Sequence, residues 1–270
     1  MRLPGSIWLS MWCAGERKSE ADFVAVRDCG VVDGVEIWTE HPDALWEVEM
    51  GAKYGLQVGI HLPFHDLNPV SADAVVAARA LERNRQWLRD LAAHGGVHAV
   101  LHGGYAANAA ERDSVLPRLV EVASTLHTEA AELGIELMLE NLIPDKLGYT
   151  HIMASNLPEW QHLIAEIGCG AVLDTSHSAA SGIALSDVFE TLGHSVRAIH
   201  LSDNDEQSDL HLLPGDGHDV TAGLPAILTD LGYTGVITYE ISPLRYTLDD
   251  VLQHIVAPNT SGDASHPRSR

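Results

Sequence analysis

The chain has 270 residues, of which 46% are hydrophobic, so it can bury one large core and does not have the composition of a disordered chain. Its 16 basic and 38 acidic side chains give a formal net charge of −22. This charge disfavours a nucleic acid partner, because an acidic surface repels phosphate. The apolar runs in the sequence are too short to span a membrane.

The cysteines and the N-terminus bear on the cellular compartment. Cys13, Cys29 and Cys169 are an odd number without metal-ligand spacing, so we expect reduced thiols in a cytoplasmic protein. The stretch MRLPGSIWLSMWCAG resembles a signal peptide only faintly, because it has a single Arg, an early Pro and a short apolar run. We expect it to form the first strand.

Short β-rich apolar runs recur along the chain, with helical patterns between them. The runs span residues 6–12, 34–38, 56–62, 97–104, 135–141, 170–177, 196–203 and 235–242. Residues 72–96 and 116–134 have apolar positions at helical spacing and end near Gly, and NLPEW (156–160) is typical of a helix start.

Apolar strands that alternate with helices indicate a parallel sheet covered on both faces. Eight such units predict one α/β domain, a closed (β/α)8 barrel over residues 1–256, followed by a flexible polar tail at 257–270. A doubly wound open sheet is the alternative. It normally carries a Gly-rich fingerprint after the first strand, and the sequence has none there.

Side chains that bind metals recur where these runs end. In a parallel barrel the carboxyl ends of the strands meet at one face, so residues far apart in sequence become neighbours. Imidazole and carboxylate groups suit Mn²⁺, Zn²⁺, Fe²⁺, Co²⁺ or Mg²⁺, and converging carboxylates are unfavourable unless a cation neutralises them. We therefore predict a divalent metal site at this face. The residues concerned are His61, His102, Glu140, Asp174, His177, His200, Asp209, His211 and Glu240.

Other polar residues are weaker candidates. Glu36 and Trp38 close the second run and could contact substrate, although packing would explain Trp38 equally well. Lys146 and Arg245 are the clear cations of the strand-end loops and are candidates for substrate binding. Further candidates, either to line the site or to cap the next helix, are His65, Asp66 and Asn68.

The remaining histidines and acids have simpler interpretations. We expect structural roles, in helices or turns, for His94, His98, His127 and His162. We expect solvent-exposed loop positions for Asp203, Asp205 and Glu206. His218 follows the PGDG turn and is compatible with either role.

Five motifs carry a resemblance: MLEN, VLDTSH, IHLSDND, DLHLLPGDG and TYEIS. With them, residues 6–256 resemble the xylose isomerase-like TIM-barrel superfamily, which includes sugar-phosphate isomerases, epimerases and endonuclease IV. The resemblance implies that one metal is shared by Glu140, Asp174, His200 and Glu240. Positions that match the ligands of two further metals in endonuclease IV are His61, His102, His177, Asp209 and His211. One to three metals are therefore compatible with the resemblance, as is a homo-oligomer.

Two enzyme classes fit this residue set. The first is an isomerase or epimerase of a small sugar-like polyhydroxy carbonyl compound. Its metal would stabilise an enediolate, Glu140 and Glu240 would transfer the proton, and His177 would orient a substrate oxygen. The second is a multinuclear zinc phosphodiesterase, although the scarcity of cations argues against DNA as its substrate. A metal-dependent lyase or dehydratase on a related substrate is a further alternative. A barrel without activity is the weakest hypothesis, because both glutamates are present.

Overall fold

The computed structural model describes residues 3–65 and 67–257. Asp66 and the predicted tail beyond Ala257 lie outside this part of the chain. Within it, none of the helices combines the length and the apolar character that crossing a lipid bilayer requires. The three cysteines, all in the described part, form no disulfide.

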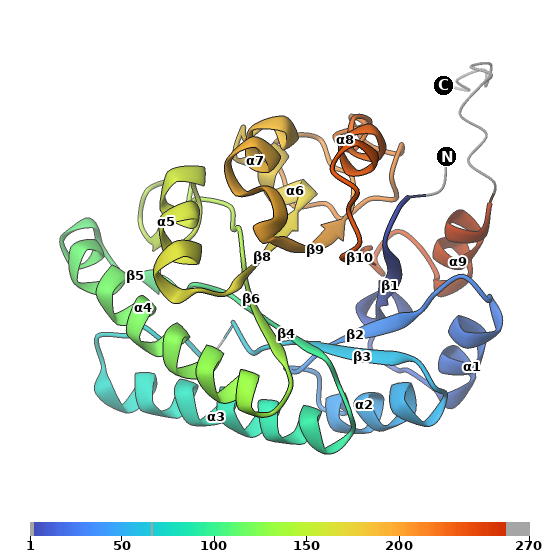
Figure 1. Cartoon of the computed structure of the whole chain (residues 1–270), viewed down its shortest axis with the longest axis horizontal. Coiled ribbons are helices and arrows are strands. Elements are labelled where there is room, and N and C mark those ends of the chain that lie inside the picture. Colours follow the sequence, from blue (N-terminus) through green and yellow to red (C-terminus); the bar gives the residue numbers. More distant parts are fainter. Residues whose placement is uncertain (1–2, 66, 258–270) are drawn as a thin grey trace.

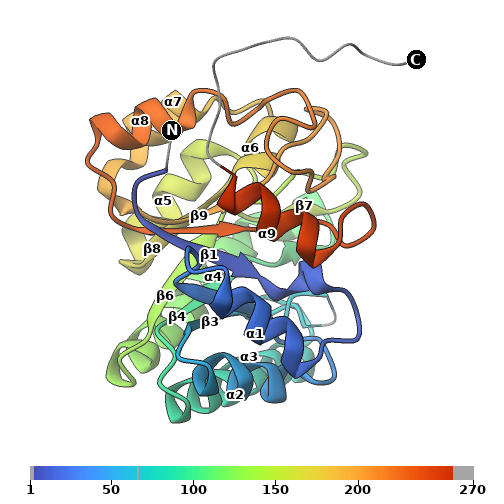
Figure 2. The same ribbon diagram turned by 90° about the vertical axis from the view of Figure 1, so that its right-hand side faces the viewer.

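Eight parallel strands close into a barrel in the order β1-β10-β9-β8-β6-β4-β3-β2, with helices around the outside (Figures 1 and 2). This confirms the predicted fold. The barrel strands are β1 (Ser6–Ser10), β2 (Gly34–Trp38), β3 (Gln57–His61), β4 (His98–Leu101), β6 (Glu136–Glu140), β8 (Gly170–Asp174), β9 (Val196–Leu201) and β10 (Val236–Tyr239). Two short strands, β5 (Tyr105–Ala106) and β7 (His151–Ile152), pair antiparallel outside the barrel.

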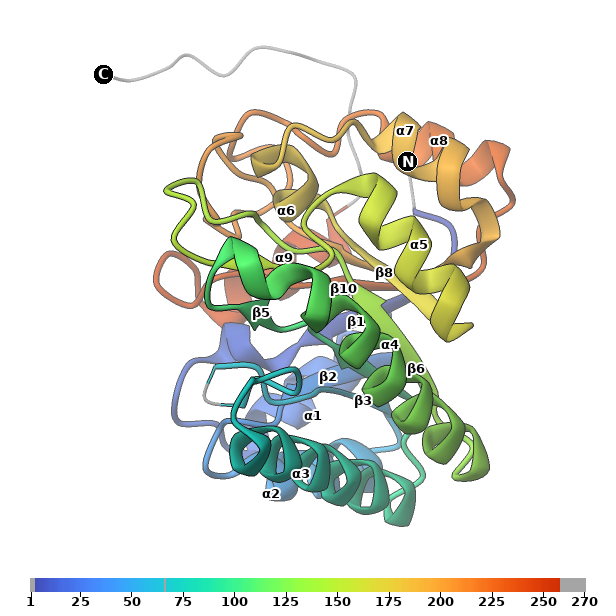
Figure 3. The same ribbon diagram turned by 90° about the vertical axis from the view of Figure 1, so that its left-hand side faces the viewer.

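The α-helices cover the barrel, and Figure 3 shows α3, α4 and α5 on one side of it. They are α1 (Glu20–Asp28), α2 (Ala44–Lys53), α3 (Ala74–Ala93), α4 (Ala109–Glu132), α5 (Leu157–Ile167), α6 (Thr175–Ala180), α7 (Leu185–Leu192), α8 (Leu224–Asp230) and α9 (Leu248–Val256). Short 3-10 turns are η1 (Met11–Ala14) and η2 (Gly193–Ser195).

Helix starts follow their capping residues. Asp73 accepts from the first amides of α3, and Asn156 accepts from the amide of Glu159 in α5. The predicted helix at 116–134 begins earlier, at Ala109, because Asn108 caps it and Pro117 is accommodated inside.

The barrel interior is built from alternating strand positions, since successive side chains of a strand point to opposite faces. Val100, Met138, Val172 and Ala198 form a small apolar cluster. Each stands two residues before a predicted ligand, so the same alternation carries the ligands inward, one layer above this cluster.

Two glycines make room for large rings inside the barrel. A Cβ at Gly34 would lie 2.4 Å from the Trp8 ring, and one at Gly59 would lie 2.2 Å from His98 Nε2. Trp8 and His98 stack with 4.6 Å between their ring centroids. These rings lie beneath the metal-ligand candidates and fill the space that a smaller side chain would leave open.

Candidate active site

Four buried side chains converge where β6, β8, β9 and β10 end. Ligand atoms of Glu140, Asp174, His200 and Glu240 all lie within 4.8 Å of one another. Nδ1 of His200 lies 3.3 Å from Glu140 Oε1 and 3.1 Å from Glu240 Oε2. This is the group that the sequence predicts to share one metal.

The donor atoms of this group fit a cation. Among the described residues, Asp174 Oδ2 and His200 Nδ1 are buried and have no partner with hydrogen-bond geometry. Unsatisfied buried acceptors are unfavourable, and a divalent ion would satisfy both. Carboxylates with one imidazole suit Mn²⁺, Zn²⁺, Co²⁺ or Mg²⁺.

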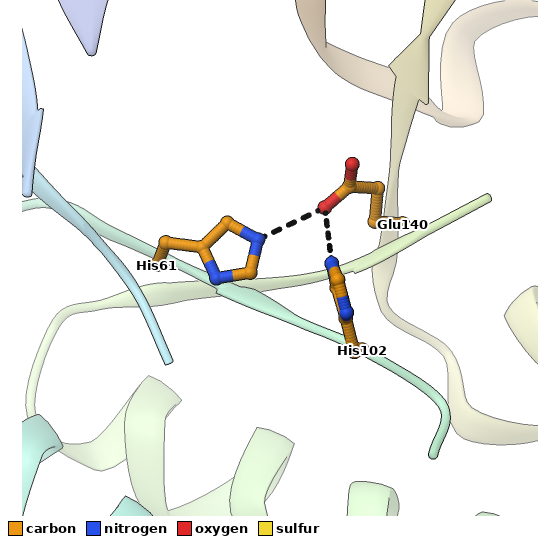
Figure 4. Close-up of side chains that lie close together, drawn as sticks. All are labelled: His61, His102 and Glu140. Carbon is orange, nitrogen blue, oxygen red and sulfur yellow. Dashed lines mark hydrogen bonds and ion pairs between the residues drawn. The ribbon is translucent and has the colours of Figure 1, made fainter. Parts of the chain in front are cut away.

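A second group shares Glu140. Figure 4 shows His61, at the end of β3, and His102, just after β4, directed at the same carboxylate oxygen. Nε2 of each lies 3.1 Å from Glu140 Oε2. His61 Nδ1 lies 3.0 Å from the Leu62 carbonyl, which can only accept, so Nδ1 carries the proton and Nε2 is left for a ligand role.

A third group lies in the loops that follow β8 and β9. Asp209 Oδ2 lies 3.3 Å from His177 Nε2, and its Oδ1 lies 3.0 Å from His211 Nε2. Both imidazoles donate Nδ1–H to backbone carbonyls, His177 to Asn141 at 2.8 Å and His211 to Glu240 at 3.0 Å. Both therefore present Nε2 to Asp209, an arrangement that also suits a metal.

Glu36 and His98 lie inside the barrel, beneath the predicted metal ligands. Glu36 is fully buried, and its two oxygens lie 3.1 Å from His200 Nε2 and 3.0 Å from His98 Nε2. The expected substrate contact of Glu36 is therefore corrected, because the side chain points into the barrel and orients His200. His98, expected in a helix or turn, instead begins β4.

Burial and neighbouring charges shift the pKa values of the side chains in this site. Burial raises the pKa of Asp174 to about 6 and lowers that of His102 to about 4. Burial also opposes the charged form of His211, yet the hydrogen bond to Asp209 raises its pKa to about 9. Burial disfavours ionised Glu140 too, but the charge of His200 and the contacts with His102 keep its pKa well below the usual value. The positive charges of neighbouring imidazoles thus offset the cost of burying ionised carboxylates in this site.

A cleft of about 870 Å³ has two tryptophans in its wall, and none of the nine predicted metal ligands is among the described residues that line it. Trp12 and Trp38 line it, and their rings stack with 4.6 Å between centroids and 10° between planes. Trp38 Nε1 donates to Glu240 Oε1 at 3.1 Å. Trp38 therefore links the cleft wall to a candidate acid–base group.

Lys146 and Arg245, the cations predicted to bind substrate, do not line this cleft. Lys146 Nζ donates to the Gln207 carbonyl, and Arg245 is exposed after β10. Neither is among the described residues that line the cleft, whereas Arg17 and Lys18 are. Lys18 is already paired with the buried Glu47 at 3.1 Å.

The weaker candidates fall outside the metal-ligand groups. Asn68 neither lines those groups nor caps α3, since its side chain holds the backbone of Val70 and Tyr105. His65 is exposed and pairs with Glu40 at 2.7 Å. His218 is exposed near Glu206. Helical or helix-end positions are confirmed for His94, His127 and His162.

The acidic loop after β9 contains one clear error of prediction. Asp203, expected to face solvent, is fully buried and accepts hydrogen bonds from five backbone amides. Asp205 and Glu206 retain exposure, as expected. Asn141 was also missed: it accepts from the Asp174 amide at 2.7 Å, and its carbonyl orients His177. Its position directly after Glu140 in MLEN is the signal that could have found it.

Comparison with known proteins agrees with this architecture. A family model described as xylose isomerase-like TIM barrel matches residues 23–256. A fructoselysine 3-epimerase of Escherichia coli O157:H7 is 30% identical over 127 residues, which are 46% of this chain and 45% of that protein, so the match spans less than half of the curated relative.

Solved structures show the same fold. A D-tagatose 3-epimerase-like protein has a TM-score of 0.76 at 21% identity, covering 93% of this chain and 97% of that one. The IOLI protein, solved with a zinc atom, has a TM-score of 0.74 at 16% identity, covering 93% and 95%. The barrel order, together with the family match over most of the chain, shows that this protein belongs to the xylose isomerase-like TIM barrel family.

Proposed function

We propose that this protein is a metal-dependent isomerase or epimerase of a sugar or a sugar-like polyhydroxy carbonyl compound. The observation that carries the proposal is the pairing of two buried glutamates, Glu140 and Glu240, within 3.3 Å of one imidazole nitrogen of His200. The 3-epimerase among its curated relatives supports the same reaction class.

The metal would be held by Glu140, Asp174, His200 and Glu240. A divalent ion bound there supplies Lewis-acid polarisation of substrate oxygens. The buried acceptor of Asp174 supports this assignment, because it has no hydrogen-bond partner within the described residues.

The glutamates would perform the proton transfer. One removes the proton next to the substrate carbonyl and the other returns a proton to the same carbon, so the two carboxylates must approach from different sides. Glu140 comes from β6 and Glu240 follows β10, which are not neighbours in the barrel. Trp38 restrains Glu240 through its indole N–H, and His177 would orient a substrate oxygen.

The experiment measures the incorporation of solvent deuterium into D-tagatose and fructoselysine. Proteins similar to this chain are named after these two compounds. We expect Glu140→Gln and Glu240→Gln each to lower turnover and exchange by about 10²- to 10⁴-fold, the range for losing a general acid or base. Glu166→Gln, an exposed acid on α5, is the matched control and should behave as wild type. Undiminished exchange in both site variants would contradict the mechanism.

A second candidate is a multinuclear zinc phosphodiesterase. The observation that favours it is the presence of three ligand groups among the described residues, the second being His61–His102–Glu140 and the third His177–Asp209–His211. Metal analysis separates the two. Three zinc ions per chain with hydrolysis of bis(p-nitrophenyl) phosphate would favour the phosphodiesterase, whereas one ion with deuterium exchange would favour the epimerase.

A further inference from the structure

We propose that Asp203 is a positioning residue that holds His211 and Asp209 in place through the loop at residues 204–220, which we call the β9–α8 loop. The proposal concerns how these two side chains are fixed and does not depend on which reaction they serve. Asp203 lies three residues after His200 and is fully buried.

The Asp203 carboxylate is surrounded by backbone N–H groups. Its Oδ1 accepts from Asn204 at 2.8 Å and Val220 at 3.1 Å. Its Oδ2 accepts from Gly215 at 3.0 Å, Gly217 at 3.1 Å and Asp219 at 3.1 Å. Hydrogen bonds to a carboxylate are roughly twice as strong as neutral ones. One side chain therefore ties together both ends of the loop.

The loop sequence is shaped around this carboxylate. A Cβ at Gly217 would lie 2.4 Å from the Asn204 carbonyl oxygen and 2.8 Å from Asp203 Oδ1. Asp219 has a φ of +56°, a left-handed conformation that turns its amide toward Asp203 Oδ2. The five amides thus form a cradle that the Asp203 carboxylate fills.

The main chain of Asp203 extends this control to His211. Asp203 and Leu212 exchange two backbone hydrogen bonds of 2.8 Å, and Leu212 directly follows His211. His211 itself has a φ of +47°, which is strained for a residue with a side chain. On its other side, the His211 carbonyl accepts from the Ser242 amide at 2.9 Å. His211 is therefore held between the ends of β9 and β10.

Asp209 depends on the same framework. Within the described part of the chain its carboxylate pairs with His177 and His211, and the residue is otherwise exposed. If His211 moves, Asp209 loses one of its two partners. Asp203 thus acts on Asp209 through His211, without touching either Nε2.

The test replaces Asp203 and follows two readouts that need no substrate. Amide exchange of Leu212 and Ser242 reports the position of His211, and titration calorimetry with Zn²⁺ reports the ligand groups. We expect Asp203→Asn to speed exchange at both amides and to weaken zinc binding by about 10- to 100-fold, the range for losing a group that orients a ligand. Glu206→Gln, an exposed acid in the same loop, is the control and should match wild type.

Chemical rescue distinguishes positioning from general folding. Asp203→Ala empties the cradle of its carboxylate, and added formate should restore slow exchange and zinc affinity in a concentration-dependent way. Asp203→Asn should not respond, because its amide still fills the space. Wild-type exchange at Leu212 and Ser242 in both variants, or failure of formate to slow that exchange in Asp203→Ala, would overturn the proposal.

Discussion

For four of the five candidate ligand histidines, the neighbouring groups show which ring nitrogen is available. His61, His177 and His211 each place Nδ1 against a backbone carbonyl, which leaves Nε2 for a ligand role. His200 is reversed: Nε2 faces the Glu36 carboxylate and Nδ1 faces the metal-ligand group. Partners of this kind fix the tautomer and the ring orientation of a ligand. Glu36 therefore orients His200, a candidate metal ligand, although it does not line the cleft.

Glu36→Gln should lower the affinity of the site for Mn²⁺ or Zn²⁺ by about 10- to 100-fold, because it removes the charge that holds the proton of His200 on Nε2. Titration calorimetry measures the change, with Glu166→Gln on α5 as an exposed control. An unchanged affinity in Glu36→Gln would show that His200 is oriented by packing alone.

The sequence predicted the ligand candidates better than the residues that support them. His61, Glu140, Asp174 and His200 end β-rich runs, and strand periodicity with parallel topology is sufficient to bring such residues together. Asp203 was misjudged because an acidic loop normally faces solvent, and no spacing rule shows which acid accepts backbone amides. Which acid accepts the amides depends on the path that the loop backbone takes in the folded protein.

At the level of elements, the strands carry complementary large and small residues into the barrel. Gly34 faces Trp8, and Gly59 faces His98, which in turn contacts Glu36. Period-2 alternation predicts that these positions share a layer, but the sequence does not say which glycine opposes which ring. The register of β1, β2, β3 and β4 supplies that pairing.

Gly59→Ala should destabilise the protein by about 1–3 kcal/mol, the usual effect of overpacking a core, and should also weaken metal binding by displacing His98 from Glu36. Gly223→Ala is the control, since a Cβ there meets no atom within 4 Å and should be nearly neutral. Urea unfolding of the two variants measures the difference. Equal stability would mean that His98 has room to move.

For the whole molecule, each barrel strand begins within one residue of its predicted run, although five strands end two or three residues before the run does, and the start of α4 was not predicted. Each of the eight β-rich runs contains one barrel strand, and the regular pattern and spacing of the runs made these strands predictable. The apolar pattern predicted a helix from residue 116, but the helix begins at Ala109, where the side chain of the N-cap Asn108 accepts from its first amides. Tertiary packing of α4 against α5 and β6 outweighs the lost hydrogen bond at Pro117.

The metal-free protein should lose stability as pH rises from about 6.5 to about 9. The pKa of His211 is raised from 6.5 to about 9 by Asp209 against the effect of burial, and neighbouring carboxylates shift the pKa of His177 and His200 in the same direction. A raised histidine pKa stabilises the fold below the unfolded value and ceases to do so above the folded one. Urea unfolding in the presence of a chelator, repeated across this pH range, measures the free energy of unfolding.

Metal should reverse that dependence, because ligand histidines bind as neutral imidazoles and binding releases their protons. With saturating Zn²⁺, the free energy of unfolding should therefore rise over the same pH range. Identical pH profiles with and without zinc would exclude these histidines as ligands.

The stacked pair of Trp12 and Trp38 gives the site an optical signal of its own. Trp38 is hydrogen-bonded to Glu240, and the edge of Trp12 lies against His211, 5.1 Å between ring centroids. The other four of the six tryptophans, Trp8, Trp46, Trp87 and Trp160, lie on different elements. A change at Glu240 or His211 is thus transmitted to two parallel indoles. Intrinsic fluorescence and near-ultraviolet circular dichroism can follow occupancy of this centre in unlabelled protein.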